Sequence, residues 1–169
     1  PLRRRHRPRS LGARPQEGRT AVFDRVPHPD PDVEPLAPFW AAAAEDRLVL
    51  PFNDDLGRHV WYPGGYSPYG EAAREYRWVE VSGRGRLFSW VHVTHAFLPH
   101  YRELVPFVTG LVAIDEDPDV RLPTFVVDAD PGELVCDLPV EVTFRDVSYH
   151  GVAGTTRVPA FTPTRSNAV

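Results

Sequence analysis

The pattern of apolar residues between residues 77 and 163 is the feature that most constrains the fold of this chain. Short segments of strand-like character follow one another and are separated by glycine, proline or acidic turns. Gly110 stands inside one of them and indicates a bend of the kind that barrels use at corners. Five or so antiparallel strands without a long helix predict a mainly β fold, a small Greek-key barrel of OB type. The expected strands are 77–81, 86–94, 107–114, 122–127 and 140–144, with 159–161 closing the series.

An extended arm and a short helix are expected ahead of the barrel. Residues 1–36 are rich in Arg and then in Pro, and the proline ring fixes φ, so this arm is held extended by the prolines at 27, 29, 31 and 35. Pro38 suits the first turn of a helix that carries Phe39, Trp40 and Ala43 on one side. Two such large rings must be buried, either in the core of this chain or against a neighbouring subunit.

Charge is divided unevenly along the chain. The formal net charge is -4, yet residues 1–19 hold seven Arg and one acidic residue. The remainder carries 12 Arg against 22 acidic residues, which gives about -10. An acidic body argues against a nucleic-acid groove in the folded part. The basic arm is interpreted as a tether, and contact with RNA, a membrane surface or an acidic partner is the alternative.

Cysteine content and hydropathy exclude several classes of protein. Cys136 is the only cysteine, so the chain has neither a disulfide framework nor a cysteine cage for zinc. No apolar run approaches the roughly 20 residues that span a bilayer, and PLRRRHRPRS lacks the apolar core of a secretory signal. Met is absent, so residue 1 is not expected to be the translated start. We expect a soluble, cytoplasmic protein without a membrane partner.

The stretch FNDDLGRHVWYPGGYSPYGE, residues 52–71, has the layout of a metal-binding knuckle. Two tight turns rich in Gly and Pro face each other across an expected aromatic strand, 60–62. Turns of this kind normally hold a metal between cysteines, and this stretch contains none.

These motifs, taken in order, resemble one family over residues 38–163. The strings are PFW, Leu48-Val49-Leu50, the knuckle, WVEVSGRGRLFSW, FVTGLVAID, DLPVEVTF and PAF. The family is the bacterial and archaeal one long catalogued as domain of unknown function thirty-five. The resemblance implies a helix, a rubredoxin-like zinc ribbon and a C-terminal five-stranded OB-fold. The expected boundaries are 1–36 for the arm, 37–76 for the helix and ribbon, and 77–169 for the OB-fold.

Members of this family look like non-catalytic partners of thiolase-superfamily enzymes. The resemblance therefore implies an accessory subunit of an aldolase, lyase or acyltransferase complex. The complex is expected to act on an acyl-CoA, and this chain is expected to bind no cofactor. The preferred partner is the aldolase of steroid side-chain degradation, because the Arg-rich leader is similar to a fusion linker behind a MaoC-like hydratase. A hetero-oligomer, such as a heterotetramer, is expected.

The chain departs from the family pattern at the zinc ribbon. The usual ribbon runs Cys-x-x-Cys-Gly, an aromatic-Pro turn, then Cys-Pro-x-Cys-Gly. Here the four ligand positions are occupied by Asn53, Leu56, Ser67 and Gly70, while the glycine and proline of the turns remain. A structural zinc contributes roughly 10 kcal/mol or more to a module of this size, so its loss must be offset.

Two replacements for the metal are considered. Aromatic rings can stack across the knuckle, and the candidates are Trp61, Tyr62, Tyr66 and Tyr69. An oxygen-rich cation site is the alternative, with Asn53, Asp54, Asp55 and His59 as its ligands, although adjacent acids in such a turn are more often turn residues. Aromatic residues are also favoured at the centre of protein interfaces. The partner-interface candidates are Phe39, Trp40, Trp61, Tyr62, Tyr66 and Tyr69.

A loop after the second barrel strand holds the candidates for contact with the substrate. His95, His100, Tyr101 and Arg102 are interpreted as the rim of an acyl-CoA channel, where Arg neutralises a phosphate and Tyr covers adenine or pantetheine. Ordinary surface histidines are the alternative. His92 and His95 lie on opposite faces of a strand, so they do not converge on a metal.

No nucleophile motif is visible, and Cys136 has no basic neighbour in sequence that would activate its thiol. The predicted function is thus a non-catalytic accessory subunit. A single-stranded nucleic-acid binding module is the alternative, because OB barrels often have that role. An autonomous enzyme that uses His92 and His95 ranks last.

Overall fold

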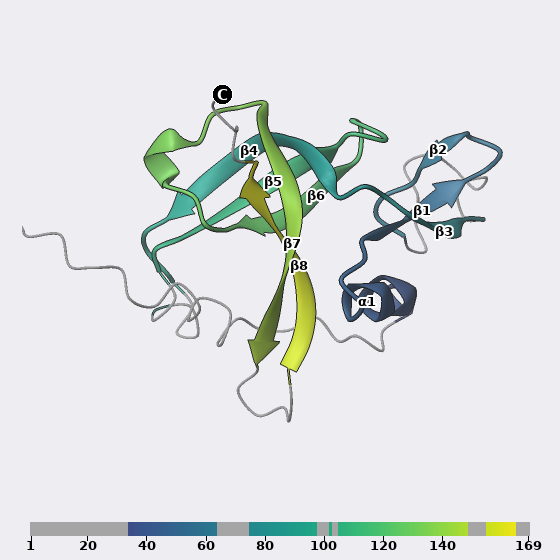
Figure 1. Cartoon of the computed structure of the whole chain (residues 1–169), viewed down its shortest axis with the longest axis horizontal. Helices are drawn as coiled ribbons and strands as arrows, with labels where there is room; N and C mark the ends of the chain where they lie inside the picture. The colour runs from purple at the N-terminus through teal and green to yellow at the C-terminus, as the bar shows by residue number, and fades with distance from the viewer. Residues whose placement is uncertain (1–33, 64–74, 98–101, 103–104, 149–154, 165–169) are drawn as a thin grey trace, which may run out of the picture.

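The computed structural model describes residues 34–63, 75–97, 102, 105–148 and 155–164. One short helix is followed by a three-stranded sheet and a closed five-stranded barrel (Figure 1). The helix and the small sheet lie on one side of the barrel, and the long β7–β8 hairpin extends from it. The mainly β fold predicted from the sequence is confirmed.

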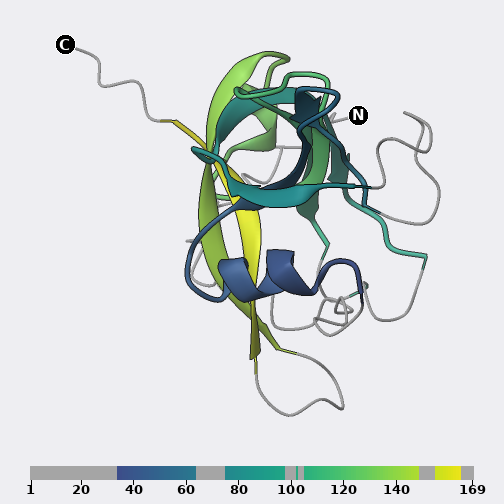
Figure 2. The same cartoon turned by 90° about the vertical axis from the view of Figure 1, so that its right-hand side faces the viewer.

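The helix α1 (Ala37–Ala43) begins with Pro38 in its first turn, where a missing N–H costs nothing, as expected. Its buried residues are Phe39, Ala42 and Ala43. The chain leaves the helix through Asp46, whose φ of 58° no longer fits a right-handed helix. Figure 2 shows α1 beside the part of β8 that extends beyond the barrel. Asp46 and Arg157 join the two elements through hydrogen bonds of 2.7 and 3.1 Å.

The small sheet, which we call the ribbon, has the order β2–β1–β3. Its strands are β1 (Val49–Asn53), β2 (Arg58–His59) and β3 (Arg77–Glu80), all antiparallel. The segment 77–80 pairs with β1 from Val49↔Glu80 to Phe52↔Arg77. The boundary expected at residue 77 assigns this strand to the barrel. Strand pairing instead places it in the ribbon. The expectation differed because an apolar pattern indicates that a strand exists but not which neighbouring strand it pairs with.

The barrel consists of β4 (Arg84–Val93), β5 (Phe107–Ile114), β6 (Arg121–Val126), β7 (Leu138–Ser148) and β8 (Thr155–Pro163). The strands close in the order β4–β5–β6–β8–β7, and a 3₁₀ turn, η3 (Pro131–Glu133), connects β6 to β7. Neighbours are antiparallel except for β6 and β8, which are parallel. An odd number of strands cannot close with antiparallel pairs alone, so one parallel pair is required. This order is that of an OB-fold.

Glycine allows a close approach of two strands in the barrel wall. A β-bulge shifts the register of β4 between Leu87 and Ser89, opposite β5. A Cβ atom at Gly110 would lie 2.7 Å from the Ser89 carbonyl oxygen and 3.1 Å from Leu87. Only glycine lets the two backbones approach this closely. The bend at Gly110 stays a prediction.

One hydrophobic core joins the helix, the ribbon and the barrel. Phe39 from α1 and Leu50 from β1 belong to the same buried cluster as Leu87, Val112 and Phe161 of the barrel. Leu50 and Leu87 are completely buried. Burial of each such side chain contributes about 1.5–3 kcal/mol. Because this core is continuous, packing against the barrel stabilises the ribbon in addition to the ribbon's own strand pairing.

Candidate partner-binding site

Aromatic rings connect the helix to the end of the ribbon. Trp40 contacts Phe39 edge-on at 4.8 Å between ring centroids, and Phe39 lies 5.7 Å from Trp61. Trp61 in turn contacts Tyr62 edge-on at 5.4 Å. We call Trp40, Phe39, Trp61 and Tyr62 the aromatic row. Such contacts contribute about 0.5–1.5 kcal/mol each beyond the area they bury.

Exposure differs strongly along the aromatic row. Phe39 is only 7% exposed and belongs to the core of this chain, so it is not available to a partner. Trp40 and Trp61 are partly buried against the same core. Tyr62 is 57% exposed and presents its ring to solvent. The row is therefore anchored in the core through Phe39 and exposed at its Tyr62 end, an arrangement that suits a protein-docking patch on a rigid base.

The strand expected over 60–62 lies slightly earlier in the chain. The strand β2 covers Arg58–His59, and Val60 still donates its backbone N–H to the Pro51 carbonyl at 3.0 Å. Trp61 and Tyr62 follow this last pairing. Both residues lie beyond the end of β2, and Trp61 contacts Phe39 of the helix. The alternation of apolar residues in the sequence does not indicate this placement.

Asn53 stands at the first of the four positions where the family pattern has a zinc ligand, and it is 1% exposed. Its Oδ1 accepts a hydrogen bond from the Leu56 N–H at 2.7 Å, and its Nδ2 donates to the Glu75 carbonyl at 2.6 Å. Leu56, the second position, is 39% exposed. The other two positions, Ser67 and Gly70, and the interface candidates Tyr66 and Tyr69, lie outside the described residues.

The acidic side chains of the first turn do not converge with Asn53 and His59. Asp54 forms a double hydrogen bond with Arg77, at 2.9 Å to Nε and 3.0 Å to Nη2. The Arg77 guanidinium holds the pKa of the Asp54 carboxyl below its usual value. His59 has its Nδ1 3.3 Å from the Pro51 carbonyl. Among the described residues, no group of three or more His, Cys, Asp or Glu side chains is arranged to hold a metal.

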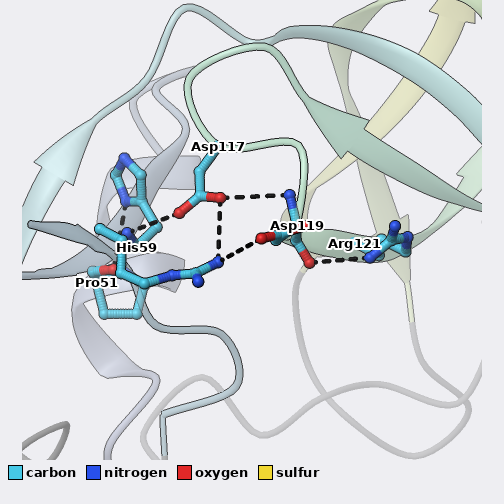
Figure 3. A network of polar contacts seen from close by, with 6 residues as sticks. Pro51, His59, Asp117, Asp119 and Arg121 are labelled. Carbon is cyan, nitrogen blue, oxygen red and sulfur yellow. Dashed lines mark hydrogen bonds and ion pairs between the residues drawn. The ribbon is translucent and has the colours of Figure 1, made fainter. Parts of the chain in front are cut away.

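A polar network fixes the ribbon to the barrel (Figure 3). Asp117, in the turn between β5 and β6, accepts hydrogen bonds from the His59 backbone N–H at 3.1 Å and from Arg58 Nη2 at 3.3 Å. Arg58 also contacts Asp119 at 3.1 Å. The acidic turn 115–119 has the composition of a solvated hairpin turn, but two of its carboxylates face the ribbon. Only the docking of the two sheets brings these residues, almost 60 positions apart, together.

A third carboxylate of the same turn bonds to the segment that links ribbon and barrel. Glu116 accepts a hydrogen bond from the Ser82 backbone N–H at 2.6 Å. Partial burial raises the pKa of the Glu116 carboxyl, but the hydrogen bonds from Ser82 outweigh it and leave the pKa lowered.

The predicted channel residues are described only in part. His95 is exposed and lies edge-on to Phe97, at 5.2 Å between ring centroids, just beyond the end of β4. Arg102 is also exposed. His100 and Tyr101 lie outside the described residues. The channel rim therefore stays a prediction.

A pocket of about 720 Å³ opens at the end of the barrel near η3, and no motif in the sequence indicates it. Its lining includes four carboxylates, from Asp128, Asp130, Glu133 and Glu141. Anionic phosphates are repelled by such a lining, so this pocket does not suit the nucleotide end of CoA. Cys136 is exposed in the same region of the chain.

The described part of the molecule belongs to the class of OB-fold proteins that carry a helix and a small three-stranded ribbon ahead of the barrel. The family model of the ChsH2 C-terminal OB-fold domain matches residues 78–145. The fold is similar to a chain of a solved structure named Ltp2-ChsH2(DUF35) aldolase, with a TM-score of 0.63 and 23% sequence identity. This similarity covers 80% of the present chain and 100% of the other. No curated protein matches the sequence significantly.

Both matches support the resemblance to the family of domain of unknown function thirty-five. At 23% sequence identity, the structural similarity shows that the two chains share a fold and nothing beyond the fold. In the described part of the chain, no helix is long and apolar enough to cross a membrane.

Proposed function

We propose that this chain is a non-catalytic accessory subunit of a thiolase-fold enzyme that cleaves or forms a carbon–carbon bond in an acyl-CoA thioester. The observation that carries the proposal is the similarity in fold to the full length of a chain from an Ltp2-ChsH2(DUF35) aldolase. The match of residues 78–145 to the ChsH2 barrel family supports it independently. The aldolase of steroid side-chain degradation is the preferred partner, and a hetero-oligomer is the expected assembly.

The outer part of the aromatic row, Trp61 and Tyr62, is the proposed docking surface. Tyr62 is exposed and contacts Trp61, which in turn contacts Phe39 of the common core. A rigid aromatic side chain loses little conformational entropy on binding, which makes it an efficient interface residue. His95, His100, Tyr101 and Arg102 remain the proposed contacts with the acyl-CoA at the edge of the complex.

Co-purification tests the proposal directly. The full chain, with an affinity tag, is co-expressed with a candidate thiolase-fold protein, and the eluate is analysed by size-exclusion chromatography. We expect a stable complex that cleaves a β-hydroxyacyl-CoA into a shorter acyl-CoA and a carbonyl product, and little or no cleavage by either subunit alone. Cleavage or condensation of acyl-CoA by this chain without a partner overturns the proposal.

The nucleic-acid alternative has a separate test. Single-stranded oligonucleotides are titrated into the chain lacking residues 1–19, at two salt concentrations. Salt-sensitive micromolar binding to this acidic body favours the alternative, because phosphate contacts release counterions. Absence of binding, together with complex formation, favours the accessory subunit.

A further inference from the structure

The residues at the described ligand positions of the ribbon do not fit a zinc ion. Zinc in structural sites takes four side-chain donors, usually Cys and His. Leu56 has no electron pair to offer, and it points to solvent at 39% exposure. The amide of Asn53 is committed on both sides, to the Leu56 N–H and to the Glu75 carbonyl.

We propose that the Asn53 amide replaces the metal as the cross-link of the ribbon, which is therefore stable without any metal. This inference goes beyond the proposed function and does not depend on it. A metal at this place would join the first turn to the second turn, at positions 67 and 70. Asn53 instead joins the first turn to the segment just before β3 with two hydrogen bonds, because Leu56 lies in the first turn and Glu75 immediately precedes β3.

The position of Asn53 on β1 allows it to reach both neighbours. Asn53 is the last residue of the strand and pairs with Arg58 of β2. On the other edge the last pair is Phe52↔Arg77, one residue earlier. The Nδ2–Glu75 bond therefore extends the β1–β3 pairing beyond its last backbone pair. The Oδ1–Leu56 bond closes the turn in which Gly57 has a φ of 62°.

Burial strengthens this cross-link. Asn53 is 1% exposed, so water does not compete for its amide. If either hydrogen bond is lost, a polar group of Asn53 or of its partner is left without a hydrogen bond, which costs free energy. Outside the core, the Asp54–Arg77 ion pair spans the same two segments at the surface. Arg77 also lies over the Phe52 ring, 5.2 Å from its centroid.

Hydrogen exchange and thermal unfolding of the full chain test the inference, with and without EDTA. In the Asn53→Ala variant we expect the Leu56 amide to exchange about tenfold faster or more, the size of effect of one lost hydrogen bond, and the unfolding midpoint to fall. The control is Asp55→Ala, an exposed residue of the same turn, which should change neither quantity. EDTA should leave the wild-type midpoint unchanged.

The Asn53→Asp variant separates the cross-link from simple packing. A carboxylate still accepts from Leu56 but repels the Glu75 carbonyl, whereas a protonated carboxyl can donate to it. We expect a lowered midpoint at pH 7 that recovers toward the wild-type value near pH 4. Three results overturn the inference: unchanged Leu56 exchange in Asn53→Ala, a wild-type midpoint that falls in EDTA and is restored by zinc, or no recovery of Asn53→Asp in acid. If Asn53→Ala does not fold, Asn53→Asp still decides.

Discussion

The carboxylate of Asp117 in the barrel accepts a hydrogen bond from the backbone N–H of His59 in the ribbon, at 3.1 Å. The Asp117 side chain is only 12% exposed, and its other oxygen contacts Arg58 at 3.3 Å. A single buried carboxylate thus satisfies groups of the ribbon that would otherwise lose their hydrogen bonds on docking.

Replacement of Asp117 should loosen the ribbon. We expect Asp117→Ala to reduce the free energy of unfolding by about 1–3 kcal/mol, because the His59 N–H is left buried without its acceptor. Urea unfolding measures the loss. Asp115→Ala in the same turn is the matched control, since Asp115 is exposed and should give a change within about 0.5 kcal/mol. Equal effects of the two substitutions would contradict the role of Asp117.

The close approach of β4 and β5 should not tolerate a side chain at Gly110. In Gly110→Ala the new methyl group would lie 2.7 Å from the Ser89 carbonyl oxygen, and both belong to rigid strands. We expect a loss of about 1–3 kcal/mol in the free energy of unfolding, as for overpacked cores. Gly132→Ala is the control, because its Cβ would approach no atom closer than 3.4 Å. A fully stable Gly110→Ala protein would show that the bulge opposite can move.

Acid should weaken the link between Glu116 and Ser82. The folded-state pKa of Glu116 is lowered, so its contribution to stability is present above the usual carboxyl pKa of about 4.3. That contribution is lost as the pH falls through the lower folded-state value. Glu116→Gln should therefore be less stable than wild type at pH 7, and the difference should shrink below pH 4. Chemical unfolding at several pH values measures it, and a difference that is constant with pH would refute the assignment.

Tyr62 should matter for assembly and not for folding. Tyr62 is 57% exposed, so Tyr62→Ala should leave the unfolding midpoint nearly unchanged. The affinity for the proposed thiolase-fold partner should fall about tenfold or more. Val135→Ala is the control, since Val135 is 56% exposed in the segment between η3 and β7. Isothermal titration with the purified partner gives both affinities. Equal affinities for the two variants would place the interface elsewhere.

The Cys136 thiol should react as an ordinary exposed thiol. The side chain is accessible, so a thiol reagent should modify it in the folded protein, and Cys136→Ser should change stability by no more than about 0.5 kcal/mol. If the proposed complex has aldolase activity, this substitution should leave that activity unchanged. Loss of that activity would give the thiol a role that no neighbouring group explains.

Much of the barrel could be predicted because its strands are encoded locally. Alternation of apolar residues predicts β4 and β5, and Pro38 predicts the start of α1. Pairing was harder to predict. The segment 77–80 has the character of a barrel strand but joins the ribbon, and the parallel β6–β8 pair follows from closure of five strands.

The candidate site was predictable in part. Aromatic residues indicated the docking row, but only the structure shows that Phe39 belongs to the core while Tyr62 stays exposed. Nothing in the sequence around the acidic turn 115–119 indicated that it contacts the ribbon. A turn rich in Asp has the same appearance whether its carboxylates face water or a second sheet.

By itself the sequence determined that the chain is mainly β and that its ribbon contains no cysteine, and it carried the motifs of the family resemblance. These properties depend on residue type and local spacing. Only the tertiary structure decided what Asn53 and Asp117 do, because each acts on residues far away in the chain: Asn53 on Glu75 and Asp117 on His59. Hydrogen bonds across such separations form when the strands pair and the core closes, and no local pattern specifies them.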